Sequence, residues 1–148
     1  MVSMEDVRRA IDPEEPDYVR AAGELGPDAL PFLAELASSE DAMIASKAVS
    51  LAGLIGGEGS IPIVEIAAEA GPPEVRVVAA VAAGRLGGKA ERALLRLLED
   101  EDLGVRKYAV RAVPKRATGR LRDALEQMAE SESDPSLRRH VRESLTEE

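Results

Sequence analysis

The residues that could perform chemistry are few in this sequence and lie far apart. The 148 residues include one histidine and no cysteine, which excludes thiol catalysis, thiolate metal sites and disulfides. His140 lies between Arg139 and Val141 near the C-terminus, and a single histidine there does not assemble into a catalytic triad. We therefore interpret His140 as a surface residue and predict that the chain is not an enzyme.

Two short segments have some features of binding loops, but neither has the complete pattern. Residues 56–60 (GGEGS) contain the glycines of a phosphate-binding loop without a preceding strand or a following Gly-Lys-Ser/Thr. Residues 99–102 (EDED) lack the alternating oxygen ligands and the central glycine of a calcium loop. We interpret the first segment as a turn between helices and the second as a helix end followed by an N-cap. We therefore expect neither a metal nor a cofactor.

A repeat of about thirty residues determines where the remaining polar residues fall. Residues 72–100 read as two helices, because apolar residues recur with the helical period on both sides of a central glycine pair. We expect Gly87-Gly88 to supply the left-handed conformation that ends the first helix, and we expect Leu94 and Leu97 of the second helix to be core residues. A pair of helices this short cannot bury its own apolar faces, so successive pairs must stack on one another.

Two sets of landmarks support the same register. The apolar residues that correspond to Val75 are Ile44, Val105 and Leu137, and the glycines that close the first helices are Gly26, Gly56 and Gly87. Directly after the apolar landmark stand Arg76, Arg106 and Arg138, although Ala45 departs from this pattern. Three residues before the landmark stand Asp41, Asp102 and Asp134, which we predict to be helix N-caps.

Units with an aspartate, an apolar residue, an arginine, a glycine turn and an apolar second helix resemble short HEAT-like repeats of the phycobilin-lyase type. The resemblance covers roughly residues 16–145 and implies an all-α fold, a right-handed α-solenoid (α-α superhelix) of helical hairpins. Enzymes built on such repeats are a poor match. Iron-dependent hydroxylases need several His-Glu pairs as ligands, and HEAT-like DNA glycosylases differ from this chain, which has no tryptophan and a net charge of -9.

We expect a single HEAT-like domain over residues 1–148. An N-terminal capping helix and linker occupy residues 1–15, with Ser3 as N-cap and Asp6 at the capping-box position. Four repeats occupy residues 16–133, and a C-terminal capping helix occupies residues 134–148. We expect the last residues, from Thr146 onward, to be frayed.

The fourth repeat departs from the others in a proline and in its charge. Pro114 stands where the second and third repeats carry Gly53 and Gly84, so we expect its first helix to end near Val113. Residues 103–122 contain seven Lys and Arg residues and no acid, whereas residues 1–74 contain 15 Asp and Glu against 4 Lys and Arg. We predict an anion-facing patch with partner contacts at Arg106, Lys107, Arg111, Lys115 and Arg116. The alternative is that Arg106 belongs to an Asp-Arg ladder of the repeats and that the other cations are solvated.

The resemblance also implies a second binding surface, because the second helices of HEAT-like stacks line the concave side. Charged residues at these positions include Glu69 and Glu130. The predicted partner contacts on this surface are Glu35, Glu65, Arg92, Arg96, Arg122 and Glu126. Solenoids use extended concave surfaces for their partners, while the alternative is that these charges only keep the exposed helix faces soluble.

We predict a non-catalytic protein-protein interaction scaffold or adaptor whose partner is another protein. The alternative is an accessory subunit that assists cofactor or chromophore attachment, as in the lyases that the repeats resemble. The basic patch could also hold the acidic first half of a second copy in a weak, salt-sensitive head-to-tail contact, and the net charge argues against nucleic acid. The sequence has no apolar run of membrane length and no signal peptide, which predicts a cytoplasmic protein that binds no membrane.

Overall fold

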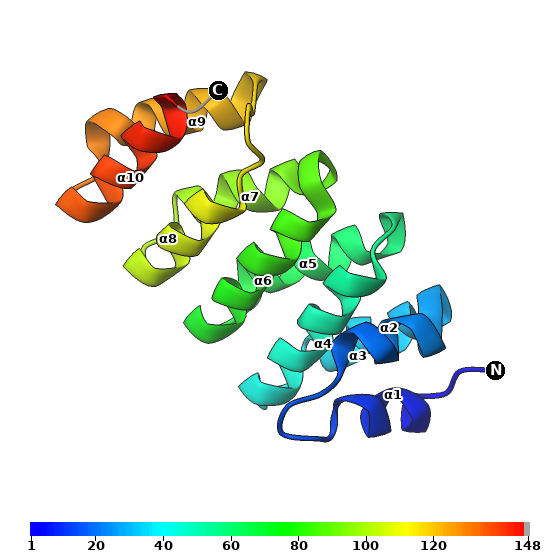
Figure 1. Ribbon diagram of the computed structural model, residues 1–148. Helices are drawn as coiled ribbons and strands as arrows, with labels where there is room; N and C mark the ends of the chain where they lie inside the picture. Colours follow the sequence, from blue (N-terminus) through cyan, green and yellow to red (C-terminus); the bar gives the residue numbers. More distant parts are fainter. Residues whose placement is uncertain (147–148) are drawn as a thin grey trace.

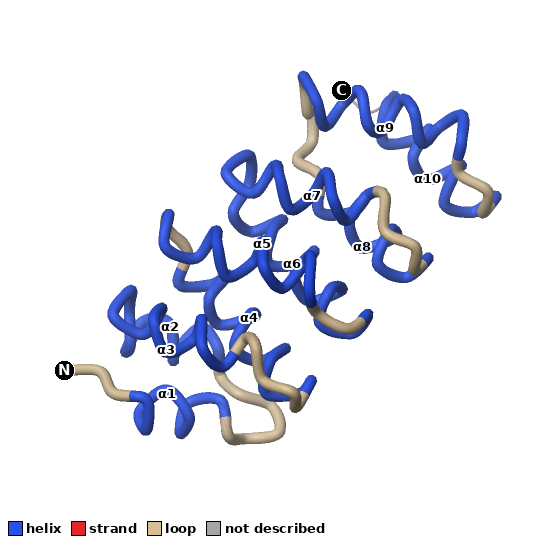
Figure 2. The backbone as a smooth tube through the Cα atoms, turned by 180° about the vertical axis from the view of Figure 1, so that it is seen from behind, coloured by secondary structure: helices blue, strands red, loops and turns tan. Residues whose placement is uncertain are grey.

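All regular secondary structure in the described part of the chain is helical. The computed structural model describes residues 1–146, and within that range it contains helices and connecting turns but no strand (Figure 1, Figure 2). The α-helices are α1 (Met4–Ile11), α2 (Tyr18–Leu25), α3 (Leu30–Leu36), α4 (Ala42–Ile55), α5 (Ile61–Ala70), α6 (Pro73–Leu86), α7 (Glu91–Leu98), α8 (Leu103–Ala112), α9 (Gly119–Ser131) and α10 (Pro135–Thr146). The prediction of an all-α fold is confirmed.

The C-terminal helix extends to Thr146, one residue into the segment that we expected to be frayed. Glu147 and Glu148, the rest of that segment, lie outside the described residues. None of the helices in residues 1–146 has the length and apolar character needed to span a membrane.

The side-chain caps predicted from the sequence begin several of these helices. At α1 the Ser3 hydroxyl accepts a hydrogen bond from the Asp6 amide, and the Asp6 carboxylate accepts one from the Ser3 amide at 2.9 Å, which completes a capping box. The carboxylates of Asp41, Asp102 and Asp134 each accept an amide hydrogen bond in the first turn of α4, α8 and α10. Local sequence therefore fixes where these helices start.

Glycine turns join the two helices of the first three hairpins. Gly56 and Gly87 have φ of 72° and 62° but ψ of -162° and -139°, a mirror-extended conformation and not the left-handed helical one that we expected. A 3-10 turn follows each glycine and leads into the second helix. In the first hairpin this turn occupies Gly26–Ala29, so the second helix of the hairpin begins only at Leu30. Pro31 lacks the N–H that a continuous α-helix would donate to the Pro27 carbonyl.

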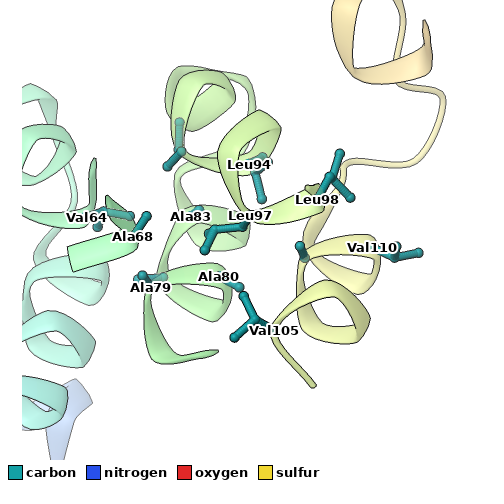
Figure 3. Packing of buried hydrophobic residues seen from close by; sticks show 14 of the residues in the cluster. Val64, Ala68, Ala79, Ala80, Ala83, Leu94, Leu97, Leu98, Val105 and Val110 are labelled. Atoms are coloured by element: carbon teal, nitrogen blue, oxygen red, sulfur yellow. The ribbon is translucent and has the colours of Figure 1, made fainter. Parts of the chain in front are cut away.

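The helical hairpins stack in a row, with first helices in one layer and second helices in the other. Helices α2, α4, α6 and α8 each pack against the next, and α5, α7 and α9 pack in the same order (Figure 1). Leu94 and Leu97 of α7 have no exposed surface, which confirms that they are core residues. Figure 3 shows Leu97 directed toward α6, among small side chains such as Ala79 and Ala83.

Two glycines allow the first helices to approach closely. A Cβ atom at Gly53 of α4 would lie 2.8 Å from the Cβ of Ala82 in α6, and one at Gly84 of α6 would lie 3.1 Å from the Cβ of Ala112 in α8. Both distances are shorter than ordinary van der Waals contact, so the absence of a side chain brings the backbones together. In register with Gly84, the fourth repeat has Pro114, and α8 ends at Ala112 with Val113 as C-cap, which confirms the predicted end of this helix.

Candidate functional site

Two arginines near the start of the first helices bind carboxylates that precede the next first helix. Arg76 of α6 donates from Nε and Nη2 to the two carboxylate oxygens of Asp100, at 2.8 and 3.0 Å. Arg106 of α8 makes the same two contacts with Glu132, at 2.8 and 3.1 Å. The carboxylate side chains are 0% and 3% exposed. We call these two ion pairs the Arg–carboxylate ladder.

Backbone groups complete each unit of the ladder. Asp100 also accepts a hydrogen bond from the Asp102 amide at 3.0 Å, while Arg106 donates to the Asp100 carbonyl at 3.0 Å. Arg138 of α10 repeats that last contact on the Glu132 carbonyl, also at 3.0 Å. Arg76 likewise donates to the Gly71 carbonyl at 2.9 Å, so the ladder connects the third and the fourth hairpin each to the turn before it and to the turn after it.

Neutralising contacts keep both ladder carboxylates charged. Burial disfavours the charged form of Asp100, but hydrogen bonds from Arg76, from the Asp102 amide and from Arg96 outweigh it and hold the pKa of Asp100 below its ordinary 3.8. Hydrogen bonds from Arg106 are the largest influence on Glu132 and hold the pKa of this carboxyl below its ordinary 4.5 despite burial. A general acid or base needs a pKa near the working pH, and these carboxylates are instead occupied by two-point arginine contacts.

The ladder acids are different residues from those that the sequence analysis singled out. The N-cap Asp102 caps α8, and the partner of each arginine is the acid two residues before the next N-cap. The sequence contains a signal for this pairing, because Asp100 and Glu132 occupy the same register. In the second repeat both corresponding positions are alanine, Ala45 and Ala70. In these three repeats, charged residues therefore stand at both positions of the pair or at neither.

Most of the predicted contacts on the second helices already have a partner within the chain. The ion pairs, with their N–O distances, are Arg92–Glu65 (4.0 Å), Arg96–Glu69 (3.2 Å) and Arg122–Glu126 (3.1 Å). Glu35 on α3 is exposed and has no ion pair among the described residues. Exposed pairs contribute little to stability, but they reduce the charge that this surface offers to a partner.

A cleft lies between the C-terminal part of α8, the connection to α9, and α10. Its volume is about 220 Å³. The apolar lining includes Val110 and Leu125, which are each 4% exposed. The charged lining consists of Arg111, Lys115, Arg116 and Arg122, His140 adds an imidazole, and the lining contains no acid. We call this site the basic cleft.

A second hollow of about 230 Å³ continues the basic cleft along α8 and α10. It shares Arg111 and His140 with the basic cleft and adds Lys107 and Arg139 to the cations, with Glu143 as the one acid in its lining. Four of the five residues predicted for the anion-facing patch, Lys107, Arg111, Lys115 and Arg116, therefore line these two hollows. The fifth, Arg106, lies in the ladder with its guanidinium bound to Glu132.

The position of the basic cleft follows from the repeat register. In the two preceding junctions, Gly53 meets Ala82 and Gly84 meets Ala112. The corresponding residues of the last junction are Pro114 and Ser144, and both line the basic cleft. Since α8 ends before Pro114, the helical contact that closes the earlier junctions is replaced here by a hollow.

The cations of the basic cleft and of the second hollow have few charged partners within the described chain. Over residues 1–146, no carboxylate lies within 4.0 Å of the charged nitrogens of Lys107, Arg111, Lys115 or Arg116. The guanidinium of Arg111 lies 5.5 Å from the ring centre of Tyr108, which fixes its position by a cation–π contact. Arg116 has φ of 62° and is the one non-glycine residue of this range with a positive φ. Such a conformation costs energy and is frequent at binding sites.

Comparison with protein families identifies the repeats. Residues 62–146, more than half of the chain, match the family described as HEAT repeats. This chain belongs to the HEAT repeat family. HEAT repeats are commonly protein-interaction scaffolds. No curated protein matches the chain.

The matched HEAT repeats contain both the ladder and the basic cleft. Within residues 1–146 no three His, Asp or Glu side chains converge as ligands for a metal. The basic cleft instead places guanidinium and ammonium groups, which form charge-assisted hydrogen bonds with carboxylates and phosphates, beside apolar side chains. The sequence analysis did not include His140 in a site, and it had no signal for doing so, because His140 reaches the cleft from α10 across the last junction.

Proposed function

We propose that this chain of HEAT repeats is a non-catalytic scaffold or adaptor that binds another protein at the basic cleft. One observation carries the proposal: cations without carboxylate partners in the described chain gather around an apolar hollow. The three pairs on the second helices are already formed within the chain. The basic cleft therefore offers a partner charges that are not used within the described chain.

The second helices contribute to the same function as an additional contact surface. We propose that the stack winds into a right-handed superhelix with these helices on its concave side, so that Glu35, Glu65 and Arg92 face a long partner. The proposal treats residues 1–148 as one domain with four repeats over residues 16–133. It also places the chain in the cytoplasm. The sequence has no cysteine and forms no disulfides, so its folding does not require an oxidising compartment.

The proposal is tested by affinity capture from the source cells with two matched variants. The cleft variant changes Lys107, Arg111, Lys115 and Arg116 to Ser, and the second-helix variant changes Glu35, Glu65, Arg92 and Glu126 to Ser. We expect the second-helix variant to recover the same partner as the wild-type chain in a smaller amount, and the cleft variant to lose it. Unchanged recovery by a cleft variant with a normal helical spectrum would contradict the proposal.

A second candidate function is the accessory subunit that assists cofactor or chromophore attachment. The observation in its favour is the short repeat of about thirty residues, which resembles the phycobilin-lyase type. This function requires that the captured partner carries a covalent cofactor and that attachment to it is slower without the chain. A partner that carries no cofactor would favour the general scaffold.

A further inference from the structure

We infer that the basic cleft binds an acidic polypeptide segment that inserts one apolar side chain between α8 and α10. This inference rests on the proposed scaffold function and adds the chemistry of the partner. Three properties of the cleft lead to it, namely its size, its apolar walls, and the arrangement of its cations.

The basic cleft taken by itself has a size that fits a single side chain. Pockets that enclose cofactors and drug-sized ligands have volumes of roughly 300–1,000 Å³, whereas the basic cleft has about 220 Å³. Its apolar walls come from three elements, with Val110 from α8, Leu125 from α9 and Leu145 from α10. When an apolar side chain enters the cleft, its own surface and the apolar walls are both removed from water, which is favourable in proportion to the apolar area buried.

The cations extend beyond the cleft in one direction. Arg111, Lys115 and Arg116 lie at the cleft itself, and Lys107 and Arg139 continue the positive charge along the second hollow. An elongated positive surface matches an elongated anion, such as a chain with carboxylates on both sides of its apolar residue. Glu143 lies at the far hollow, so we expect the acids of the partner to concentrate on the Lys115 side.

Nucleic acid fits the same cations less well. Binding of single strands combines positive charge with aromatic rings on which bases stack, and within the described chain no Phe, Tyr or Trp lines either hollow, where His140 is the one ring. Tyr108, whose ring centre lies 5.5 Å from the Arg111 guanidinium, is 40% exposed but lines neither hollow. A long phosphate backbone would also meet the acidic first half of this chain, which raises the free energy of the complex.

The inference is tested by fluorescence anisotropy with labelled probes. The first probe is a short peptide of glutamates around a central leucine; the others replace the leucine with glycine, or replace the glutamates with lysines. A single-stranded oligothymidine serves as the nucleic-acid probe. We expect the leucine peptide to bind most tightly, the glycine peptide to bind roughly tenfold more weakly because the apolar burial is lost, and the affinity to fall with added salt.

Two variants of the cleft separate the charge from the apolar hollow. In the charge variant Arg111 and Lys115 become Ser and Arg116 becomes Gly, a residue that adopts the φ of this position without strain. Its matched control changes three exposed cations elsewhere, Arg8, Arg85 and Lys89, to Ser. In the filling variant Ser144→Leu places a side chain in the hollow with the charges intact. We expect the charge variant to lose peptide binding, the control to keep it, and the filling variant to bind the leucine and glycine peptides equally.

Each other result overturns the inference. If the oligothymidine binds more tightly than the leucine peptide, the cleft is a nucleic-acid surface. If sedimentation shows that the wild-type chain self-associates and the charge variant does not, the occupant is a second copy. If no probe binds although affinity capture still depends on the cleft cations, the acidic-peptide inference fails while the scaffold function stands. If the cleft cations affect neither experiment, both fail.

Discussion

The junction of α6 with α8 and the junction of α8 with α10 have the same register but different contacts. In the first, Gly84 lets the two backbones approach, and the Arg76–Asp100 pair closes the side of the turn. In the second, the corresponding Arg106–Glu132 pair is kept, but Pro114 replaces the glycine and the basic cleft occupies the place of the helical contact. The ladder and the contact of α9 with α7 hold the last hairpin in the stack.

This difference teaches that packing and ion pairing have separate roles in the stack. The junction of α4 with α6 has the close glycine contact at Gly53 but alanines in place of the ion pair, and the last junction has the ion pair without the close contact. Either feature alone is therefore compatible with a continuous stack. A junction that keeps only the ion pair has space for a binding site.

The comparison predicts that core leucines differ in importance between the closed and the open junction. Leu97→Ala should lower the free energy of unfolding by about 2–5 kcal/mol, because it leaves a cavity in a core without exposed surface. Leu125→Ala should cost less, because Leu125 already borders the basic cleft and loses fewer packing contacts. Denaturant unfolding of both variants measures this order. Equal costs would show that the last junction is packed as tightly as the others.

Variants of the Arg–carboxylate ladder give a second test of the comparison between the two junctions. Arg76→Ala should destabilise the chain by about 2–4 kcal/mol, somewhat less than the usual 3–5 kcal/mol for breaking a buried pair, because Arg96 and the Asp102 amide still contact Asp100. The double variant Arg76→Ala with Asp100→Ala should recover part of this loss, since it reproduces the alanine pair that the second repeat carries naturally. A double variant less stable than Arg76→Ala would contradict the structural role of the pair.

The close approach of the first helices gives a graded prediction for three glycines. Gly53→Ala should destabilise by about 1–3 kcal/mol, because the new Cβ would lie 2.8 Å from that of Ala82. Gly84→Ala should cost less, since its contact would be 3.1 Å. Gly23→Ala in α2 should stabilise by about 0.5–1 kcal/mol, because no atom lies within 4 Å and alanine favours a helix. Thermal melts of the three variants test whether this order holds.

Acid should weaken the ladder. In the folded chain Asp100 and Glu132 have pKa values below their ordinary 3.8 and 4.5. Their contribution to the free energy of unfolding is therefore complete above the ordinary pKa values. It is lost as the pH falls through the lower pKa values of the folded chain. We expect the melting temperature to decline from about pH 5 toward pH 3. In Glu132→Gln, which has lost one of the two groups, the decline should be shallower. An equal decline in both chains would show that other carboxylates cause it.

The smallest expected change in the free energy of unfolding is at Pro114, the residue by which the last junction differs from the one before it. Pro114→Ala removes the interruption of α8, so the helix should extend by up to one turn toward the connection and narrow the basic cleft. The free energy of unfolding should change by no more than about 1 kcal/mol, in line with a substitution in an exposed connection. Circular dichroism should show slightly more helix, and peptide binding at the cleft should weaken. No gain in helix would indicate that residues 115–118 prevent the extension by themselves.

The sequence determined the features that depend on neighbouring residues. The helical periods, the caps at Ser3, Asp41 and Asp102, and the end of α8 before Pro114 were all predicted correctly, because capping, periodicity and proline act within one or two turns. The glycine turns were predicted in place, although not in their backbone conformation. The repeat register follows from the same local signals, since it only requires that they recur.

Only the tertiary structure decided which charged side chains are paired within the chain and which are available to a partner. Arg106 was one of seven cations in residues 103–122 of the sequence, and only the stacking of hairpins brings it to Glu132, 26 residues away. Arg111 and His140 likewise meet only across the last junction. Such contacts depend on the distance between helices, and that distance is set by whether a glycine or a proline stands at the crossing point, together with everything packed around it. Rules for capping and periodicity act within one or two turns and do not give that distance.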